Sequence, residues 1–573
     1  MSTIKWQNSA NGYILRGASY VVRVRGDYNY RLEIEFDGAS IATLPGLSTL
    51  NQLDRIEKLD HVKLVQMIAE NNRAQIILTA DSSCWNKRTF YWSFTPTNIS
   101  FYHTAEGQGR LGQCFFFSRN NLVDGAISIE NDIHYNCRIN LTNYFTPWVR
   151  LSSLSDFDVI NPGSAGLTEW NQNLLFAPCP LMFAFYKQNT YVGIGLGCKP
   201  GSYNFRALEY SGSKIGGASF YVDYLGYQEI NGFISTPAVA MHFGYDRYDV
   251  LKQHIAWTDL EGYSTKRKYE NADWHREPVF CSWAEQGVAA AEQGVYTNSA
   301  CTQQNFENWI NILEERQIPA STLIIDEKWQ KQYGTFEIDV EKWPDMKGFV
   351  AKQHDKGRHV LLWAPGYHTE GLPAEWCSKD PSGKIKFANP FNRGYEAFLR
   401  EKLTYLVKEV GVDGFKEDWF GGTAAVPGYT DYGPHGIELL RKFQTILFES
   451  AHQVKPDAMI QTQTPNPLFR DCSDVLRLND IYCSTRMVSR MMQNRARIAK
   501  IAGWEVIDCD NASSTTADEW FDYMQKQILL GTPSLYCLTR TEFSKEEIPD
   551  YMWAHISAIW KKYREDNDVQ YHR

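Results

Sequence analysis

The segment Gly411-Val-Asp-Gly-Phe-Lys-Glu-Asp-Trp419 is the clearest sign of the fold of this chain. It is a short run of mostly apolar residues that ends in charged side chains, as a buried strand with a functional end does. Seven further apolar runs lie between residues 277 and 540, and amphipathic stretches separate them. Apolar runs that alternate with amphipathic helices indicate a parallel sheet buried on both faces. The predicted strands are Pro278–Trp283, Thr322–Asp326, His359–Ala364, Val412–Asp418, Ala458–Thr464, Val475–Asp480, Glu505–Asp510 and Ser534–Thr539. Eight such strands predict a closed (β/α)8 TIM barrel.

The region before the barrel has a different pattern. Up to about residue 245, short runs alternate between apolar and polar residues, as in Tyr20–Arg25, and turn signals such as Asp37-Gly38 separate them. A period of two with Asp-Gly turns is typical of antiparallel strands. We therefore expect an N-terminal antiparallel β-sandwich over residues 1–245.

Between these two parts, residues 246–276 combine a helical pattern with a polar, charge-rich stretch. They are interpreted as a helical linker, so that the barrel domain occupies residues 277–573. The clearest helical patterns in the linker and the barrel are Asp249–Thr258, Asn305–Glu315, Tyr395–Val410 and Ile548–Lys562.

Composition narrows the classes of function. The chain has 573 residues, a formal net charge of −9 and a sequence pI near 5.9. This balance argues against nucleic acid or an anionic membrane as the main partner and favours a neutral ligand. The N-terminus lacks the apolar core of a signal peptide, so the cytoplasm is the expected compartment. The 12 cysteines show no metal-ligand spacing and are expected to be free core thiols. We expect no metal, and homo-oligomer formation stays open.

Acids and tryptophans gather at the carboxyl ends of the predicted strands, where TIM barrels carry their functional side chains. These residues are Trp283, Glu285, Asp326, Glu327, Trp329, Trp363, Lys416, Asp418, Trp419, Asp480, Asp508 and Asp510. Carboxylates crowded in one cavity raise one another's pKa, which favours a proton-transfer or sugar-binding site over a purely structural cluster. Asp508 and Asp510 are expected to support neighbouring residues or to cap a helix.

Lys416 and Asp418 share one face of their strand, while Glu417 points the other way, because side chains alternate along a strand. If Asp418 faces the mouth of the barrel, Lys416 does so too. The ammonium group would then hold Asp418 ionised, as a nucleophile requires, and could donate a hydrogen bond to a sugar hydroxyl.

The same segments carry a family resemblance. They are Ile324-Ile-Asp-Glu-Lys-Trp-Gln330, Phe336-Glu-Ile-Asp-Val-Glu-Lys-Trp-Pro-Asp-Met-Lys-Gly348, His359-Val-Leu-Leu-Trp-Ala-Pro-Gly366 and Gly411 to Trp419. In order and spacing they resemble the clan D retaining α-glycosidases of glycoside hydrolase families 31 and 36. Lys416-x-Asp418 resembles the lysine–aspartate nucleophile motif of that clan. An N-terminal β-sandwich is also similar to those families.

The resemblance implies α-linked substrates, net retention of configuration and no cofactor. It implies that Asp418 is the nucleophile. Val475-Leu-Arg-Leu-Asn-Asp480 resembles the segment of family 36 that carries the acid/base, which makes Asp480 the expected acid/base with Arg477 beside it. The remaining expected substrate contacts are Asp326, Glu327, Trp329, Trp363, Lys416 and Trp419. An α-galactoside is the favoured substrate.

Several alternatives stay open at this point. Asp471 or Asp474 replaces Asp480 if the sixth strand is misplaced, and Trp329 and Trp363 are either pocket walls or core. An α-glucosidase, an α-xylosidase or a transglycosylase would use the same chemistry. Outside that chemistry, a non-catalytic carbohydrate-binding protein would lack one carboxylate, and a metal-dependent barrel hydrolase would need a ligand cluster at a strand end.

Overall fold

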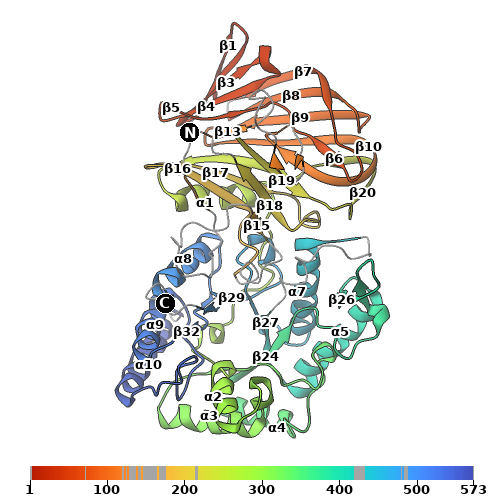
Figure 1. The fold of residues 1–573 in the computed structure, drawn as a ribbon. Helices are drawn as coiled ribbons and strands as arrows, with labels where there is room; N and C mark the ends of the chain where they lie inside the picture. The colour runs from red at the N-terminus through yellow and green to blue at the C-terminus, as the bar shows by residue number, and fades with distance from the viewer. Residues whose placement is uncertain are drawn as a thin grey trace.

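The computed structural model describes residues 3–571 except 71, 119–121, 124–125, 128–136, 140–142, 146–163, 167–175, 213–216, 419–432, 479 and 483–487. Two layers of antiparallel strands form one half of the molecule, and a barrel surrounded by helices forms the other (Figure 1). Helix α1 (Arg247–Leu260) lies at the boundary between the two halves. The domain limits at residues 245 and 276 stay a prediction.

The first half is antiparallel throughout its described strands, as the alternating sequence pattern predicts. In β4, for example, Leu32, Ile34 and Phe36 are buried and the residues between them are not. Strand β10 pairs with β9, β20 and β21 in one sheet and with β6 and β19 in the other, so it joins the two layers. The strands are β1 (Lys5–Ser9), β2 (Gly12–Arg16), β3 (Tyr20–Arg25), β4 (Arg31–Phe36), β5 (Ala39–Leu44), β6 (Leu50–Gln52), β7 (Leu59–Glu70), β8 (Arg73–Ser82), β9 (Lys87–Phe94), β10 (Asn98–Phe116), β11 (Leu122–Val123), β12 (Ala126–Ile127), β13 (Cys137–Ile139), β14 (Asn143–Phe145), β15 (Ser164–Gly166), β16 (Met182–Lys187), β17 (Thr190–Gly197), β18 (Ala207–Gly212), β19 (Gly217–Asp223), β20 (Glu229–Ser235) and β21 (Ala238–Gly244).

The second half is an eight-stranded parallel sheet in the order β31-β29-β28-β27-β24-β23-β22-β33. A parallel bridge between Asp508 of β31 and Thr532, just before β33, brings the two edges together and nearly closes the barrel. All eight predicted strands are confirmed. They are β22 (Val279–Cys281), β23 (Thr322–Ile325), β24 (His359–Pro365), β27 (Gly414–Asp418), β28 (Met459–Thr462), β29 (Val475–Arg477), β31 (Ile507–Asp508) and β33 (Ser534–Leu535). Two short pairs accompany them, β25 (Cys377–Lys379) with β26 (Ile385–Ala388) and β30 (Ile481–Tyr482) with β32 (Ala512–Ser513).

Helices follow most of the barrel strands and begin at capping residues that the sequence shows. Thr302 caps α3 and Asn392 caps α5 by accepting backbone N–H donors, as expected for these residue types. The last helix continues to Tyr571, beyond the predicted end at Lys562. The helices are α2 (Trp283–Gln293), α3 (Gln303–Glu315), α4 (Met346–His354), α5 (Arg393–Tyr405), which is prolonged by the π-turn Leu406–Val410, α7 (Gly436–His452), α8 (Val488–Ile501), α9 (Ala517–Leu530) and α10 (Asp550–Tyr571). No helix in the described ranges is long and apolar enough to cross a membrane.

The β-sandwich sits on the end of the barrel where the strands finish. The Glu438 carboxylate, in the first turn of α7, accepts hydrogen bonds from the backbone N–H groups of Gly201 and Tyr203 at 2.8 and 3.1 Å. Asn466, which follows β28, donates from its side chain to the carbonyl oxygen of Cys179 at 2.9 Å. Both barrel residues lie after a strand, so the sandwich lies on the face where functional side chains are expected.

Candidate active site

Asp418 is the last residue of β27 and is partly exposed. Two donors hold its carboxylate: the indole Nε1 of Trp363 donates to Oδ2 at 3.0 Å, and Nη2 of Arg477 donates to Oδ1 at 3.2 Å. Each oxygen therefore has one fixed donor. A carboxylate held in this way keeps one orientation.

Lys416 was predicted to hold Asp418 ionised, and the two groups do interact electrostatically, but the hydrogen-bond partner of Lys416 is another carboxylate. The Nζ of Lys416 donates to Oδ2 of Asp326 at 2.6 Å and lies 3.5 Å from the sulfur of Cys281. Burial lowers the pKa of Lys416, but Asp326, Cys281 and Asp418 together outweigh burial and raise the pKa, so the group stays charged. Alternation along a strand fixes which face a side chain takes, but not which of several partners on that face it reaches.

Arg477, at the end of β29, is the cation that contacts Asp418. Its side chain is buried, and Nη1 forms a second ion pair with Asp510 at 3.0 Å. Burial works against the charge of the guanidinium, but Asp510 and Asp418 outweigh it and raise the pKa. One arginine therefore connects the end of the fourth strand with the end of the seventh.

Asp510 and Tyr536 were not among the predicted site residues. The Tyr536 hydroxyl donates to Oδ1 of Asp510 at 2.6 Å, and its ring centroid lies 5.2 Å from the Nζ of Lys416. The strand-end position of Asp510 was the available signal. Tyr536 gave a weaker one, since aromatic residues at such positions are mostly core.

Asp480 lies just beyond β29, close to the same charges. Burial and the neighbouring Asp510 raise its pKa well above the ordinary value of a carboxyl, with a smaller contribution from Asp418, while Lys416 and Arg477 act in the opposite direction. Asp480 therefore binds a proton more tightly than an ordinary carboxyl does. The two competing candidates lie before β29: Asp471 pairs with Arg441, and Asp474 accepts from His452 at 3.0 Å.

Asp326 and Glu327 follow β23 on the Lys416 side of the site. Asp326 is buried and accepts from Lys416 and from the thiol of Cys281 at 3.0 Å. The Tyr333 hydroxyl donates to Oε1 of Glu327 at 2.7 Å. Burial raises the pKa of Glu327 to about 7, Asp326 and Asp418 add to the effect, and Tyr333 and Lys416 oppose it.

The three predicted aromatic contacts have different positions. Trp363 is almost completely buried and donates to Asp418, so it supports the nucleophile candidate directly. Trp329 has 0% exposure, and its Nε1 donates to the backbone oxygen of Trp363 at 2.9 Å. The side chain of Trp329 is thus core and offers no surface to a ligand in this structure. Trp419 lies outside the described residues.

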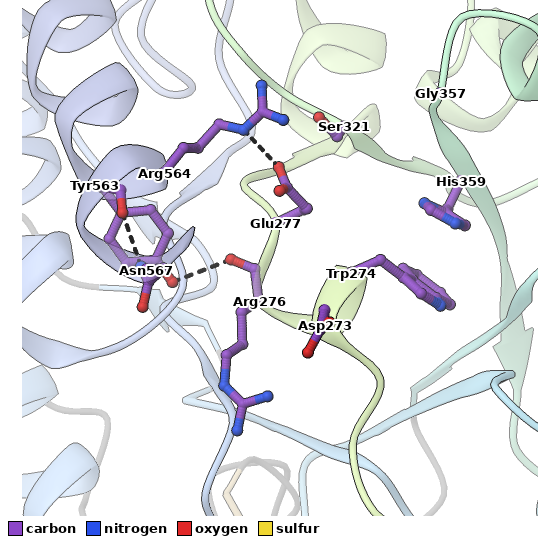
Figure 2. Close-up of a pocket in the computed structure, with 10 residues that line it drawn as sticks. All are labelled: Asp273, Trp274, Arg276, Glu277, Ser321, Gly357, His359, Tyr563, Arg564 and Asn567. Carbon is purple, nitrogen blue, oxygen red and sulfur yellow. Dashed lines mark hydrogen bonds and ion pairs between the residues drawn. The ribbon is translucent and has the colours of Figure 1, made fainter. Parts of the chain in front are cut away.

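A cavity of about 270 Å³ lies at the other end of the barrel (Figure 2). Its wall includes Ser321 and His359, which stand at the beginning of strands, and Arg564, which pairs with Glu277 at 2.8 Å. The amino end of a TIM barrel is the end associated with stability. The candidate site is therefore the group around Asp418 and not this cavity.

The described residues contain no group of three or more histidine, cysteine, aspartate or glutamate side chains placed to hold a metal ion. What the group does contain is a carboxylate fixed by two donors, a second carboxyl whose pKa is raised, and a buried lysine–aspartate pair. The first two can act as a nucleophile and as an acid, and the pair can exchange hydrogen bonds with hydroxyl groups.

The fold of the second half is a TIM barrel, and part of it matches a glycoside hydrolase domain. Residues 282–436 match the family described as "Glycosyl hydrolases family 31 TIM-barrel domain". The resemblance to the clan D retaining α-glycosidases is thereby confirmed.

Individual relatives are distant. The α-xylosidase XylQ of Lactiplantibacillus pentosus is 27% identical over 140 residues, which are 21% of this chain and 18% of that protein. A family 31 sulfoquinovosidase from E. rectale has a TM-score of 0.55 at 9% identity, covering 96% of this chain and 82% of that one. A cycloalternan-forming enzyme from Listeria monocytogenes, solved with a pentasaccharide substrate, has a TM-score of 0.51 at 12% identity, covering 98% and 59%. At these identities the structural likeness concerns the fold.

Proposed function

We propose that this protein is an exo-acting retaining α-glycosidase that removes terminal α-linked sugars by double displacement. Asp418 is the nucleophile and Asp480 is the acid/base. The observation that carries the proposal is the contrast between these two carboxyl groups. Asp418 accepts hydrogen bonds from Trp363 and Arg477, while burial and Asp510 raise the pKa of Asp480. Two carboxyls whose environments separate their protonation states are what a retaining glycosidase requires.

In the first step an oxygen of Asp418 attacks the anomeric carbon of the sugar. The glycosidic bond breaks, its electron pair stays on the leaving oxygen, and Asp480 transfers its proton to that oxygen. The sugar is then an ester of Asp418. In the second step Asp480, now a carboxylate, takes a proton from water while the water oxygen attacks the same carbon, and the ester bond to Asp418 breaks. The two inversions give retention, and Asp480 regains its proton.

The other residues act on the sugar and on the nucleophile. Arg477 and Trp363 keep the Asp418 carboxylate aimed while its charge falls during attack. Lys416 and Asp326 form a buried pair beside it that can donate to and accept from sugar hydroxyls. Glu327 offers a further acceptor next to them.

The sugar is proposed on narrower grounds. An α-galactoside is our first choice, because the segment that ends in Arg477 and Asp480 resembles that of family 36. An α-xyloside is the second choice, because a relative that shares a 140-residue segment is named an α-xylosidase. Transfer of the sugar to another sugar in place of water would use the same two steps.

The test begins with the wild-type protein and a set of α-linked nitrophenyl sugars, including the galactoside, glucoside and xyloside. Hydrolysis of at least one of them, with retained configuration of the first product by NMR, is the expected result. No turnover of any α-glycoside would contradict the proposal. Added acceptor sugars distinguish transfer from hydrolysis by the products formed.

Azide then separates the roles of the carboxyl groups. In Asp418→Gly, azide can replace the missing nucleophile and should give the β-glycosyl azide. In Asp480→Ala, azide attacks the sugar ester on Asp418 and should give the α-glycosyl azide from an activated substrate. Asp510→Ala is the matched control, since Asp510 lies beside Asp480 but is paired with Arg477. If α-glycosyl azide formed in Asp510→Ala and not in Asp480→Ala, the acid/base assignment would be wrong.

A further inference from the structure

Arg495 lies on α8, behind the segment that carries Asp480, and its side chain is 0% exposed. Its Nη1 donates to the carbonyl oxygen of Leu478 at 2.5 Å and to that of Asp480 at 3.4 Å. These two carbonyls stand on either side of residue 479. The guanidinium therefore holds the carbonyl groups of Leu478 and Asp480.

A side chain from the β-sandwich packs on this arginine. The ring centroid of Phe176 lies 5.3 Å from Cζ of Arg495, and Phe176 is fully buried. The segment from Phe176 to Pro180 is attached to the barrel as well, because Asn466 donates from its backbone to Pro178 at 3.1 Å and from its side chain to Cys179 at 2.9 Å. Phe176 is thus held against Arg495 by contacts on the same segment (Figure 1 shows α8 below the sandwich).

Arg495 also contributes a positive charge near Asp480. Burial lowers its pKa to about 10, with Cys179, Asp510 and Asp480 acting against that effect, so it is a cation at neutral pH. The charged groups that act on Asp480 come from four elements. They are Asp510 beyond β31, Lys416 and Asp418 on β27, Arg477 on β29 and Arg495 on α8.

We propose that Arg495 is a positioning residue for Asp480, and that Phe176 holds Arg495 in place, so that the β-sandwich takes part in the proton-transfer step. This inference rests on the proposed function, in which Asp480 is the acid/base. Arg495 does not reach the substrate. It acts through the two carbonyl oxygens that set where the Asp480 carboxyl stands relative to the leaving oxygen.

Two substitutions test this idea without removing the residues of the chemical step. Arg495→Lys keeps the charge, but the shorter side chain does not place a nitrogen where Nη1 donates to both carbonyls. Phe176→Leu keeps an apolar side chain but removes the aromatic face that contacts the guanidinium. A misplaced acid matters most when the leaving group needs a proton, because an activated leaving group departs without one.

The measurement is therefore the dependence of kcat/KM on the leaving group. For wild type and each variant, the substrates are a glycosyl fluoride, a nitrophenyl glycoside and an unactivated alkyl glycoside of the same sugar. For Arg495→Lys we expect a loss of about 10- to 100-fold with the alkyl glycoside and of less than about 3-fold with the fluoride. Phe176→Leu should give the same pattern with a smaller loss. The alkaline limb of the pH profile, which reports the protonated acid, should also move.

Tyr227→Leu is the matched control. Tyr227 is another aromatic residue of the sandwich that packs on the barrel. Its ring centroid lies 4.3 Å from that of His435, which stands just before α7, the helix that follows the nucleophile strand β27. Its loss should affect all leaving groups equally or not at all. Thermal melting of each variant shows whether the fold is intact.

Equal losses for all leaving groups in Arg495→Lys, or the selective pattern in Tyr227→Leu, would overturn the inference. If Arg495→Lys does not fold, Phe176→Leu decides in the same assay. Failure of the inference differs from failure of the proposed function. In the first case the wild type and the Asp480 variants behave as an α-glycosidase and its acid/base mutants, while in the second the wild type cleaves none of the substrates.

Discussion

Asp413 and Asp418 stand at the two ends of the same barrel strand and have opposite surroundings. Asp413, just before β27, is almost fully buried and accepts from His354 at 2.8 Å, from the Val360 amide at 2.6 Å and from Lys455. Burial alone would raise its pKa, but these partners outweigh it and lower the pKa below its usual range. The hydrogen-bonding capacity of the Asp413 carboxylate is therefore met by groups of the protein.

At the other end of the strand, several carboxyl groups lie close enough to raise one another's pKa. Asp418 is partly exposed, and the pKa values of Glu327 and Asp508 are raised to about 7 and about 6, mainly by burial. Crowding of this kind costs stability and is kept where it serves chemistry. The same residue type therefore stabilises the fold at one end of a strand and is available for reaction at the other.

The largest effect on activity is expected from Asp418→Asn. The amide keeps the volume and one of the two acceptor oxygens that Trp363 and Arg477 use, but it cannot form an ester with the sugar. We expect kcat to fall by on the order of 10⁴-fold or more, while the melting temperature stays within a few degrees of wild type. Rates with the best nitrophenyl substrate and a thermal melt measure both. A large loss of stability would mean that Asp418 is structural.

Asp413→Asn is expected to give the reverse result. The amide leaves Lys455 without its carboxylate and weakens the bonds from His354 and the Val360 amide. The free energy of unfolding should fall by about 2–4 kcal/mol. At a temperature where the variant is folded, kcat should change by less than about 3-fold, because Asp413 is remote from the chemistry. Denaturant unfolding checks the first figure. Loss of activity in a folded Asp413→Asn protein would remove the distinction between the two ends.

The pH dependence of Asp413 has a definite sign. Its pKa is lower in the folded protein than in the unfolded chain, so its stabilisation is present above the unfolded value of about 4. It is lost as pH falls through the lower, folded value. Wild type should therefore lose stability below about pH 4 more steeply than Asp413→Asn, measured by denaturant unfolding across that range. Parallel curves for the two proteins would contradict this assignment.

Much of the barrel could be predicted because its strands are buried on both faces and appear as apolar runs. The mouth of the barrel was predicted for the same reason, since each strand end is visible in the sequence. Which side chains meet there was harder. Lys416, two residues away, was expected to hold Asp418 ionised, but the cation that contacts Asp418 is Arg477, which comes from another strand.

Contacts between the two halves had no signal in the sequence. Phe176 and Arg495 are far apart in the chain, and neither belongs to a motif. Trp329 could be interpreted as a pocket wall or as core, because an aromatic residue at a strand end suits both, and only its complete burial decides between them. Local pattern predicts elements and their ends, whereas the partner of each charge depends on closure of the barrel.

A smaller effect is expected from Tyr536→Phe, which removes the hydroxyl that donates to Asp510 and changes little else. A hydrogen bond to a buried charged group contributes about 1.5–3 kcal/mol. Because part of that energy orients the charges of the site, we expect kcat to fall by about 10-fold. The negative charge of Asp510 would be less stabilised and would repel the Asp480 anion more strongly. The alkaline limb of the kcat/KM profile should therefore move to higher pH. A loss without that movement would assign Tyr536 to packing alone.

The smallest expected effect concerns Glu327, the carboxyl at the reactive end whose pKa is raised to about 7. A carboxyl that binds its proton more tightly in the folded protein than in the unfolded chain makes stability fall as pH rises between the two pKa values. Here that window runs from the ordinary value of 4.5 to about 7. Glu327→Gln cannot ionise but can still accept from Tyr333, so its stability should decline less than that of wild type between these limits.

Urea unfolding at several pH values tests this, and Asp413→Asn serves as the control because its change lies at lower pH. An unchanged slope in Glu327→Gln would mean that Glu327 is already ionised at neutral pH, and the contrast between the two ends of the strand would then rest on Asp480 and Asp508.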